Sequence, residues 1–154
     1  MAAIKMKTTV KLRADATSPS HSRSDISIRD LTVLIDEPVE RGGTNAGPTP
    51  TDAALAALIG CTNVIGHKCA QSLGIDIGHL AISASCDFDR RGVTLSEEID
   101  IPFERIQLTV RSDGPASADE LQRVADEVAK YCPLSKLFRR AGTIIEETWE
   151  PKAA

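Results

Sequence analysis

The longest uninterrupted feature of the chain is an apolar segment at residues 50–73, which we expect to be a single helix. Between residues 53 and 61 every position is apolar or glycine, and most side chains are small. A helix that is apolar on all sides is normally buried. The pattern therefore predicts a buried central helix around which the rest of the chain is organised.

The two ends of this helix carry clear signals. Thr49 is a typical N-cap, Pro50 occupies the first helical position, and Asp52 is the acidic residue three after the cap. Gly74 is a natural stop. Polar residues such as Lys68 interrupt the apolar run too early for a membrane span, so we do not expect one.

Strands and shorter helices are expected on both sides of the central helix. Alternating apolar and polar positions, typical of half-buried strands, occur at residues 3–13, 23–29, 77–88, 101–110 and 143–150. Residues 31–35 predict a further strand, and residues 14–22 predict a turn. Helices are expected at residues 117–130, where Ser117 and Glu120 suit a capping box, and at 134–140 after Cys132-Pro133.

This order of elements predicts an α+β fold, with antiparallel sheet packed on the long helix, because strands come in adjacent groups rather than alternating singly with helices. The length suits one domain, residues 1–154. It would consist of N-terminal strands at 1–40, the loop and central helix at 41–74, and a C-terminal α+β part at 75–154.

Composition narrows the class of protein. Lys and Arg number 18 against 22 Asp and Glu, giving a net charge of −4, and aromatic residues are 3%. A nucleic-acid binder would need a basic stripe and stacking platforms, so we expect no nucleic-acid partner. The first residues contain no long apolar run, and we expect a cytoplasmic protein without a membrane partner.

The four cysteines, Cys61, Cys69, Cys86 and Cys132, do not form a CxxC motif. Neither a secreted disulfide framework nor a zinc knuckle is indicated. His67 and Cys69 alone are only two ligands, so no metal and no cofactor are expected.

Cys61 and Cys132 are the candidate reactive thiols. Cys132 precedes a proline at an expected helix start, where the helix dipole and free N–H groups favour a thiolate. For each cysteine taken alone, the role of a small buried apolar residue is the stronger interpretation. His67 lies about 240° round the helix from Cys61, so activation would have to come from a cation such as Arg41 or Arg23.

The glycines of the loop before the helix, Gly42, Gly43 and Gly47, could in principle cradle an anion. The loop matches neither GxGxxG nor a P-loop, so a sharp turn is the favoured interpretation.

Two segments carry a resemblance to a known family. ERGGTNAGPTPTDAALAALIGCTNVIGHKCAQSLGI and KYCPLSKLFRRAG are similar to the OsmC/Ohr family of thiol-dependent, hydroperoxide-detoxifying proteins. The resemblance implies an OsmC-like fold, an intertwined homodimer with active sites at the subunit interface, and a two-cysteine mechanism of peroxide reduction.

The resemblance also implies roles for individual residues. Cys61 corresponds to the peroxidatic cysteine, Cys132 to the resolving cysteine and Arg41 to the arginine that stabilises the thiolate. The family glutamate that holds this arginine is replaced here by Thr51. Asp52, one residue on, is the candidate substitute, although helix capping is its alternative role and one residue is a rotation of about 100°.

The implied reaction forms a sulfenic acid on Cys61 and then a disulfide with Cys132, which a dithiol reductant of the lipoyl type reopens. An apolar lining from Ala57, Leu58 and Ile65 would favour organic hydroperoxides. Cys69 and Cys86 are expected in the core. The alternative function is a non-catalytic dimer that binds a small apolar ligand at the subunit interface, and a weaker third is another thiol enzyme.

Overall fold

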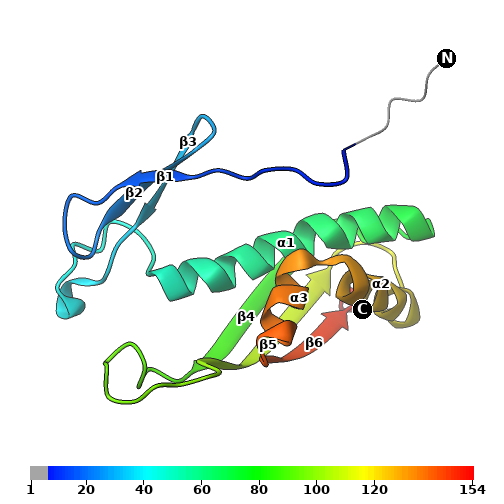
Figure 1. Ribbon diagram of the computed structural model, residues 1–154. Helices are drawn as coiled ribbons and strands as arrows, with labels where there is room; N and C mark the ends of the chain where they lie inside the picture. The colour runs from blue at the N-terminus through cyan, green and yellow to red at the C-terminus, as the bar shows by residue number, and fades with distance from the viewer. Residues whose placement is uncertain (1–6) are drawn as a thin grey trace. The chain divides into compact units, whose positions relative to one another are not determined.

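The computed structural model describes residues 7–154 and has α+β architecture, with two three-stranded sheets and one long helix (Figure 1). The chain divides into two compact units, one ending at Ala53 and the other formed by Ala54–Ala154. Each unit is described by itself below. That the whole chain acts as one domain stays a prediction.

The first unit contains an antiparallel meander of β1 (Asp15–Thr17), β2 (Ser24–Ile28) and β3 (Leu31–Ile35). The expected strands at 23–29 and 31–35 are confirmed. The first strand was wrongly placed, because residues 7–13 form no strand and β1 lies in the expected turn. Val10 and Leu12 are 72% and 90% exposed, so within the described chain the alternating segment has no neighbour to pair with. Residues 1–6 of that expected strand lie outside the described residues.

Helix α1 (Pro50–Leu73) has the predicted boundaries. Asp52 Oδ2 accepts hydrogen bonds from the Thr49 N–H at 3.3 Å and the Thr49 hydroxyl at 2.7 Å. The Asp52 N–H donates to Thr49 Oγ1 at 3.1 Å. The capping role of Asp52 is therefore present in the structure, as the sequence order of Thr, Pro and acid indicated.

The prediction that α1 is buried on all sides was wrong. Its buried residues form one stripe: Leu58, Thr62, Gly66, Cys69 and Ala70. Val64, on another side, is 51% exposed. By length and composition alone α1 could cross a membrane, a test that core helices of globular proteins also pass. A single sheet covers one stripe of a helix, which leaves an apolar face of α1 uncovered in the described chain.

The second unit holds the sheet β4 (Leu80–Phe88), β5 (Phe103–Ser112) and β6 (Ile144–Glu150), in that order. The pair β4–β5 is antiparallel, as expected. Strand β6 runs parallel to β5, which corrects the prediction of purely antiparallel sheet. The reason is the connection, because two helices between β5 and β6 form the long crossover that parallel strands require.

Those helices are α2 (Ala118–Tyr131) and α3 (Pro133–Arg140), and the predicted capping box of Ser117 and Glu120 is present. The buried residues of α1, α2, β5 and β6 share one apolar core. A Cβ added at Gly66 would lie 2.9 Å from the Trp149 ring. Because glycine has no side chain, the middle of α1 can pack closely against Trp149 of β6.

Candidate functional site

Two thiols far apart in the sequence meet within the second unit. Cys61 lies in the middle of α1, and Cys132 lies between α2 and α3. Both are free cysteines, and their sulfur atoms are 3.2 Å apart. A disulfide bond is about 2.05 Å long, so bond formation needs a closure of only about 1.2 Å. This pair can therefore cycle between dithiol and disulfide with little movement of the backbone.

Cys132 is fully buried and serves as the N-cap of α3. Its Sγ accepts a hydrogen bond from the Ser135 N–H at 3.4 Å, and its thiol donates to the Cys61 sulfur. Burial raises the pKa of Cys132 to about 11, with the N–H of Ser135 opposing and the sulfur of Cys61 adding to the rise. Desolvation thus outweighs the helix N-terminus, contrary to the expectation of a stabilised thiolate. Cys132 is a protonated thiol at neutral pH, held against a half-buried partner.

A cleft of about 320 Å³ lies between α1 and α2. It is lined by Ile65, Lys68, Cys69, Ser72, Leu73, Glu127 and Tyr131. Ile65 is one helical turn beyond Cys61, and Tyr131 precedes Cys132 in the chain. Of the three residues expected to line an apolar site, Ile65 does so here, Leu58 is buried in a separate core cluster, and Ala57 is exposed. The cleft has room for a small, largely apolar group, and its lining includes neither Cys61 nor Cys132.

The half-buried carboxylate of Glu147 links β6 to α3, the helix that Cys132 caps. Glu147 has 11% of its side chain exposed and accepts a hydrogen bond from Trp149 Nε1 at 2.7 Å. Its other oxygen lies 4.0 Å from Arg139 Nη2, and Arg139 Nε donates to Ser135 Oγ at 3.2 Å. Burial raises the pKa of Glu147, and Trp149 and Arg139 only partly oppose it. The sequence predicted a strand at residues 143–150 but assigned no role to Glu147.

Glu147 is expected to make stability depend on pH. A carboxyl group with a raised pKa in the folded state holds its proton to higher pH there than in the unfolded state. The free energy of unfolding therefore falls as the pH rises from the ordinary pKa of 4.5 through the raised pKa of the folded state. Replacing Glu147 with Gln, which keeps the acceptor for Trp149, should remove this decline. We expect urea midpoints to fall less between pH 4.5 and 7 for Glu147→Gln than for the wild type. The exposed neighbour Glu146→Gln is the control, and an equal decline in Glu147→Gln and the wild type would contradict this assignment.

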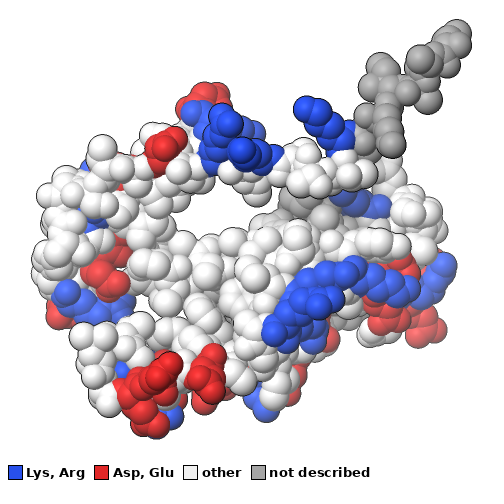
Figure 2. Space-filling model, viewed as in Figure 1, with Lys and Arg blue, Asp and Glu red and all other residues white. Residues whose placement is uncertain are grey.

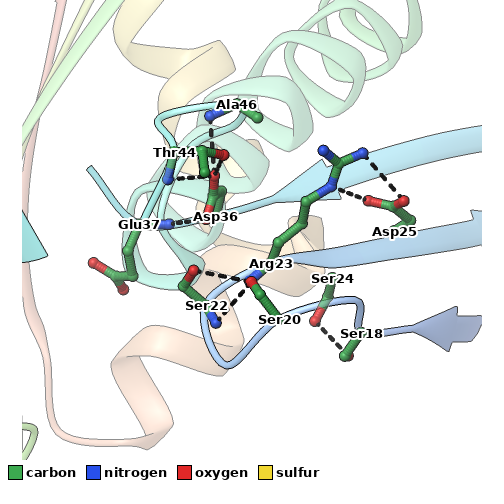
Figure 3. A network of polar contacts seen from close by, with 10 residues as sticks. All are labelled: Ser18, Ser20, Ser22, Arg23, Ser24, Asp25, Asp36, Glu37, Thr44 and Ala46. Carbon is green, nitrogen blue, oxygen red and sulfur yellow. Dashed lines mark hydrogen bonds and ion pairs between the residues drawn. The ribbon is translucent and has the colours of Figure 1, made fainter. Parts of the chain in front are cut away.

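The candidate cations lie in the first unit, and each has a carboxylate partner there. Arg41 ends the short 3-10 helix η1 (Val39–Arg41), and its Nε is 2.8 Å from Glu37 Oε2. Arg23 pairs with both oxygens of Asp25, at 2.8 and 3.2 Å (Figure 3). Glu37 is therefore the ion-pair partner of Arg41 within this unit, and sequence reasoning did not assign it although it lies four residues before Arg41.

Asp36 organises the loop that carries Arg41. This buried carboxylate accepts hydrogen bonds from the N–H groups of Glu37, Thr44 and Ala46 and from the Thr44 hydroxyl (Figure 3). These donors, the Thr44 hydroxyl foremost, hold the pKa of Asp36 well below its usual range despite burial. Sequence reasoning missed Asp36, and an acidic residue at the end of a strand before a glycine-rich loop was the available signal.

Two glycines of the same loop are required by close packing. A Cβ at Gly43 would lie 1.8 Å from the Glu37 carbonyl oxygen, and one at Gly47 would lie 2.2 Å from that of Leu34. This supports the turn interpretation over an anion cradle. Elsewhere, Cys69 is buried and Cys86 half-buried, and in residues 7–154 no group of three His, Cys, Asp or Glu side chains is arranged to hold a metal.

Comparison with known proteins identifies the relatives of this chain. The family model described as OsmC-like protein matches residues 43–147. No curated protein sequence matches. The OsmC-like protein from Mycoplasma pneumoniae has 20% identity and a TM-score of 0.73, with 92% of this chain and 98% of that chain covered.

Two further solved structures have the same fold. The organic hydroperoxide resistance protein OhrB of Bacillus subtilis has 19% identity and a TM-score of 0.62, covering 93% of this chain and 98% of that chain. The organic hydroperoxide resistance protein OsmC from Legionella pneumophila has 14% identity and a TM-score of 0.65, covering 96% of this chain and all of that one. At these identities the likeness concerns the fold.

Proposed function

Because the chain belongs to the OsmC-like protein family, we propose that it is a Cys-based peroxidase that reduces organic hydroperoxides in oxidative-stress defence. The observation that carries the proposal is the distance of 3.2 Å between the Cys61 and Cys132 sulfurs, which the fold brings together from positions 71 residues apart. A pair of free thiols at this separation suits a reaction that ends in a disulfide.

In the first step, the thiolate of Cys61 attacks the terminal oxygen of a hydroperoxide ROOH. The O–O bond breaks, Cys61 becomes a sulfenic acid, and the alkoxide takes a proton and leaves as the alcohol ROH. Cys61 is the better nucleophile of the pair because it is half-buried, whereas Cys132 is fully buried and its pKa is raised to about 11.

In the second step, the sulfur of Cys132 attacks the sulfenic sulfur of Cys61. The S–S bond forms, and the hydroxyl leaves as water with the proton of Cys132. The thiol of Cys132 already donates toward the sulfur of Cys61, so the attacking sulfur faces the sulfur that it attacks. A dithiol donor, of the lipoyl type in this family resemblance, then returns two electrons and two protons by exchange.

Arg41 is the proposed cation for the thiolate, oriented by its ion pair with Glu37 rather than by a residue of α1. Asp52 is the weaker candidate for that task, since both hydrogen bonds that its carboxylate accepts come from Thr49 and serve the cap. The hydroxyl of Thr51, where the family has glutamate, forms a hydrogen bond with Thr49 Oγ1 at 3.1 Å. Glu37 supplies the carboxylate that position 51 lacks.

This role of Glu37 predicts a loss of reactivity in Glu37→Gln. One exposed ion pair is worth up to about 1 kcal/mol, so the rate constant of Cys61 with cumene hydroperoxide should fall by roughly fivefold. Stopped-flow measurement of peroxide consumption by the reduced protein provides the rate. Glu40→Gln in the same helical turn is the matched control, and equal rates in both variants would exclude Glu37 as the residue that orients Arg41.

We also propose a homodimer. The support is the uncovered face of α1, where small residues and the half-exposed Val64 stand open in the described chain. Small residues allow a second helix to approach closely, and a second copy of α1 offers a matching surface. Sedimentation equilibrium tests this, because a monomer at micromolar concentration would contradict it.

The decisive experiment for the function is peroxide consumption by the purified protein supplied with dihydrolipoamide. We expect saturable loss of cumene hydroperoxide that exceeds the rate without protein. If peroxide is not consumed and Cys61 stays a thiol, the chain is instead a ligand-binding member of the family, with the cleft between α1 and α2 as the place to look for the ligand.

A further inference from the structure

We propose that α3 is the docking surface for the electron donor, and that this donor is an acidic protein that presents a dithiol. The inference rests on the proposed function, because it assigns a partner to the disulfide formed by Cys61 and Cys132. It follows from the charge of α3, its exposed apolar residue and its covalent continuity with Cys132.

Helix α3 concentrates positive charge in a chain that is negative as a whole. Its eight residues contain Lys136, Arg139 and Arg140 and no acidic residue, whereas the full sequence carries a net charge of −4. Among the described residues, neither Lys136 nor Arg140 takes part in an ion pair, and Arg139 reaches Glu147 only at 4.0 Å. Figure 2 shows Lys and Arg side chains gathered on the face of the molecule where α3 lies in Figure 1.

The cationic surface, formed by Lys136, Arg139 and Arg140, begins one helical turn from Cys132. Cys132 caps α3, and the Lys136 N–H donates to the Cys132 carbonyl oxygen at 3.1 Å, so Lys136 is one turn further along the same helix. Leu137, between the cations, is 64% exposed. Cations around an exposed apolar residue, about 12 Å in length along the helix axis, are suited to the surface of a protein rather than to one small anion.

Charge favours an acidic partner and orients it. The net negative charge of the chain repels an acidic protein at most approaches, whereas α3, with three cations and no acidic residue, attracts it. Transient redox partners meet through small contacts in which complementary charge sets the association rate more than the affinity. A donor guided to α3 therefore arrives next to the disulfide.

The transfer itself balances as thiol–disulfide exchange. A thiolate of the donor attacks Cys61 Sγ, which is more accessible than the buried Cys132, and the S–S bond breaks with Cys132 as leaving group, which takes up a proton. The second thiolate of the donor then attacks the donor sulfur of the mixed disulfide and releases Cys61. The donor leaves as an internal disulfide after giving two electrons and two protons.

The test measures reduction of the preformed disulfide, so it does not depend on peroxide chemistry. One equivalent of cumene hydroperoxide forms the disulfide. If the peroxide does not react, the proposed function is wrong, and diamide forms the disulfide instead so that the docking surface is still tested. The probes are three synthetic peptides with the same Cys-Gly-Pro-Cys dithiol, flanked by glutamates, glutamines or lysines. The rates are compared for the wild type and for Lys136→Gln/Arg140→Gln at low ionic strength.

The ratio of the wild-type rate to the variant rate cancels the intrinsic reactivity of each peptide. We expect a ratio of about tenfold for the glutamate peptide, near one for the glutamine peptide and below one for the lysine peptide, all approaching one in high salt. Arg90→Gln/Arg111→Gln removes the same charge from a loop and from the outer face of β5, and should leave the ratios near one. Ratios near one for all three peptides, or an equal effect in this control, would overturn the proposal.

Discussion

Peroxide turnover is expected to disappear when Cys61 is replaced by serine, with a fall of roughly a thousandfold or more in the rate of cumene hydroperoxide consumption. The physical reason is that the hydroxyl of serine is far less acidic than a thiol and cannot accept the oxygen of a peroxide as a sulfenic acid. The consumption of peroxide in the presence of dihydrolipoamide gives the measurement.

Cys69→Ser is the matched control for this prediction. Cys69 lies on the same helix and in the same apolar core, and burial raises the pKa of its thiol. Its loss should leave turnover within about twofold of the wild type, because the close sulfur contact joins Cys61 to Cys132 and does not involve Cys69. If Cys61→Ser kept wild-type activity, the proposed reaction would be wrong.

Replacing Cys132 by serine is expected to separate the two chemical steps. Serine is a good N-cap, so α3 should form normally. Cys61 should still react with the first equivalent of peroxide, which adds one oxygen, but the sulfenic acid should persist and be trapped by dimedone. Turnover should fall roughly a hundredfold, because an intramolecular thiol 3.2 Å away is replaced by a bimolecular reductant.

Excess peroxide distinguishes this result from a simple loss of folding. In Cys132→Ser, unresolved sulfenic acid should proceed to the sulfinic acid, seen by mass spectrometry as a second added oxygen. In the wild type, disulfide formation should prevent that oxidation. A Cys132→Ser protein that turns over like the wild type would show that Cys132 is not the resolving residue.

The sequence predicted best what is determined by neighbouring residues. The start of α1 follows from Thr49, Pro50 and Asp52, and the start of α2 from Ser117 and Glu120, because a cap is a local interaction. The strands and helices expected between residues 77 and 150 are present, because alternation and helical periodicity are also local patterns. The parallel pairing of β6 was not predicted, since it depends on how two intervening helices cross the sheet.

The predictions that were wrong concern apolar surfaces whose burial depends on contacts with other segments. The alternation at residues 7–13 is that of a strand, yet Val10 and Leu12 are exposed and belong to no strand of the described chain. The same applies to the apolar face of α1. An apolar pattern predicts that a surface is to be covered, without saying by what.

The candidate site was predictable only in part. Spacing alone did not bring Cys61 and Cys132 together, and their pairing came from the family resemblance. Glu37 and Asp36 were missed because their roles arise when the loop folds back, which brings Thr44 and Ala46 onto one carboxylate. The raised pKa of Cys132 was also missed, because burial cannot be judged from its place before a proline.

The most direct test of the account is the intact mass of the reduced protein after one equivalent of cumene hydroperoxide, followed by peptide mapping. We predict a product about 2 Da lighter, the loss of two hydrogens, with one disulfide that links Cys61 to Cys132. An unchanged mass with Cys61 still a free thiol, or a disulfide that involves Cys69 or Cys86 instead, would contradict it.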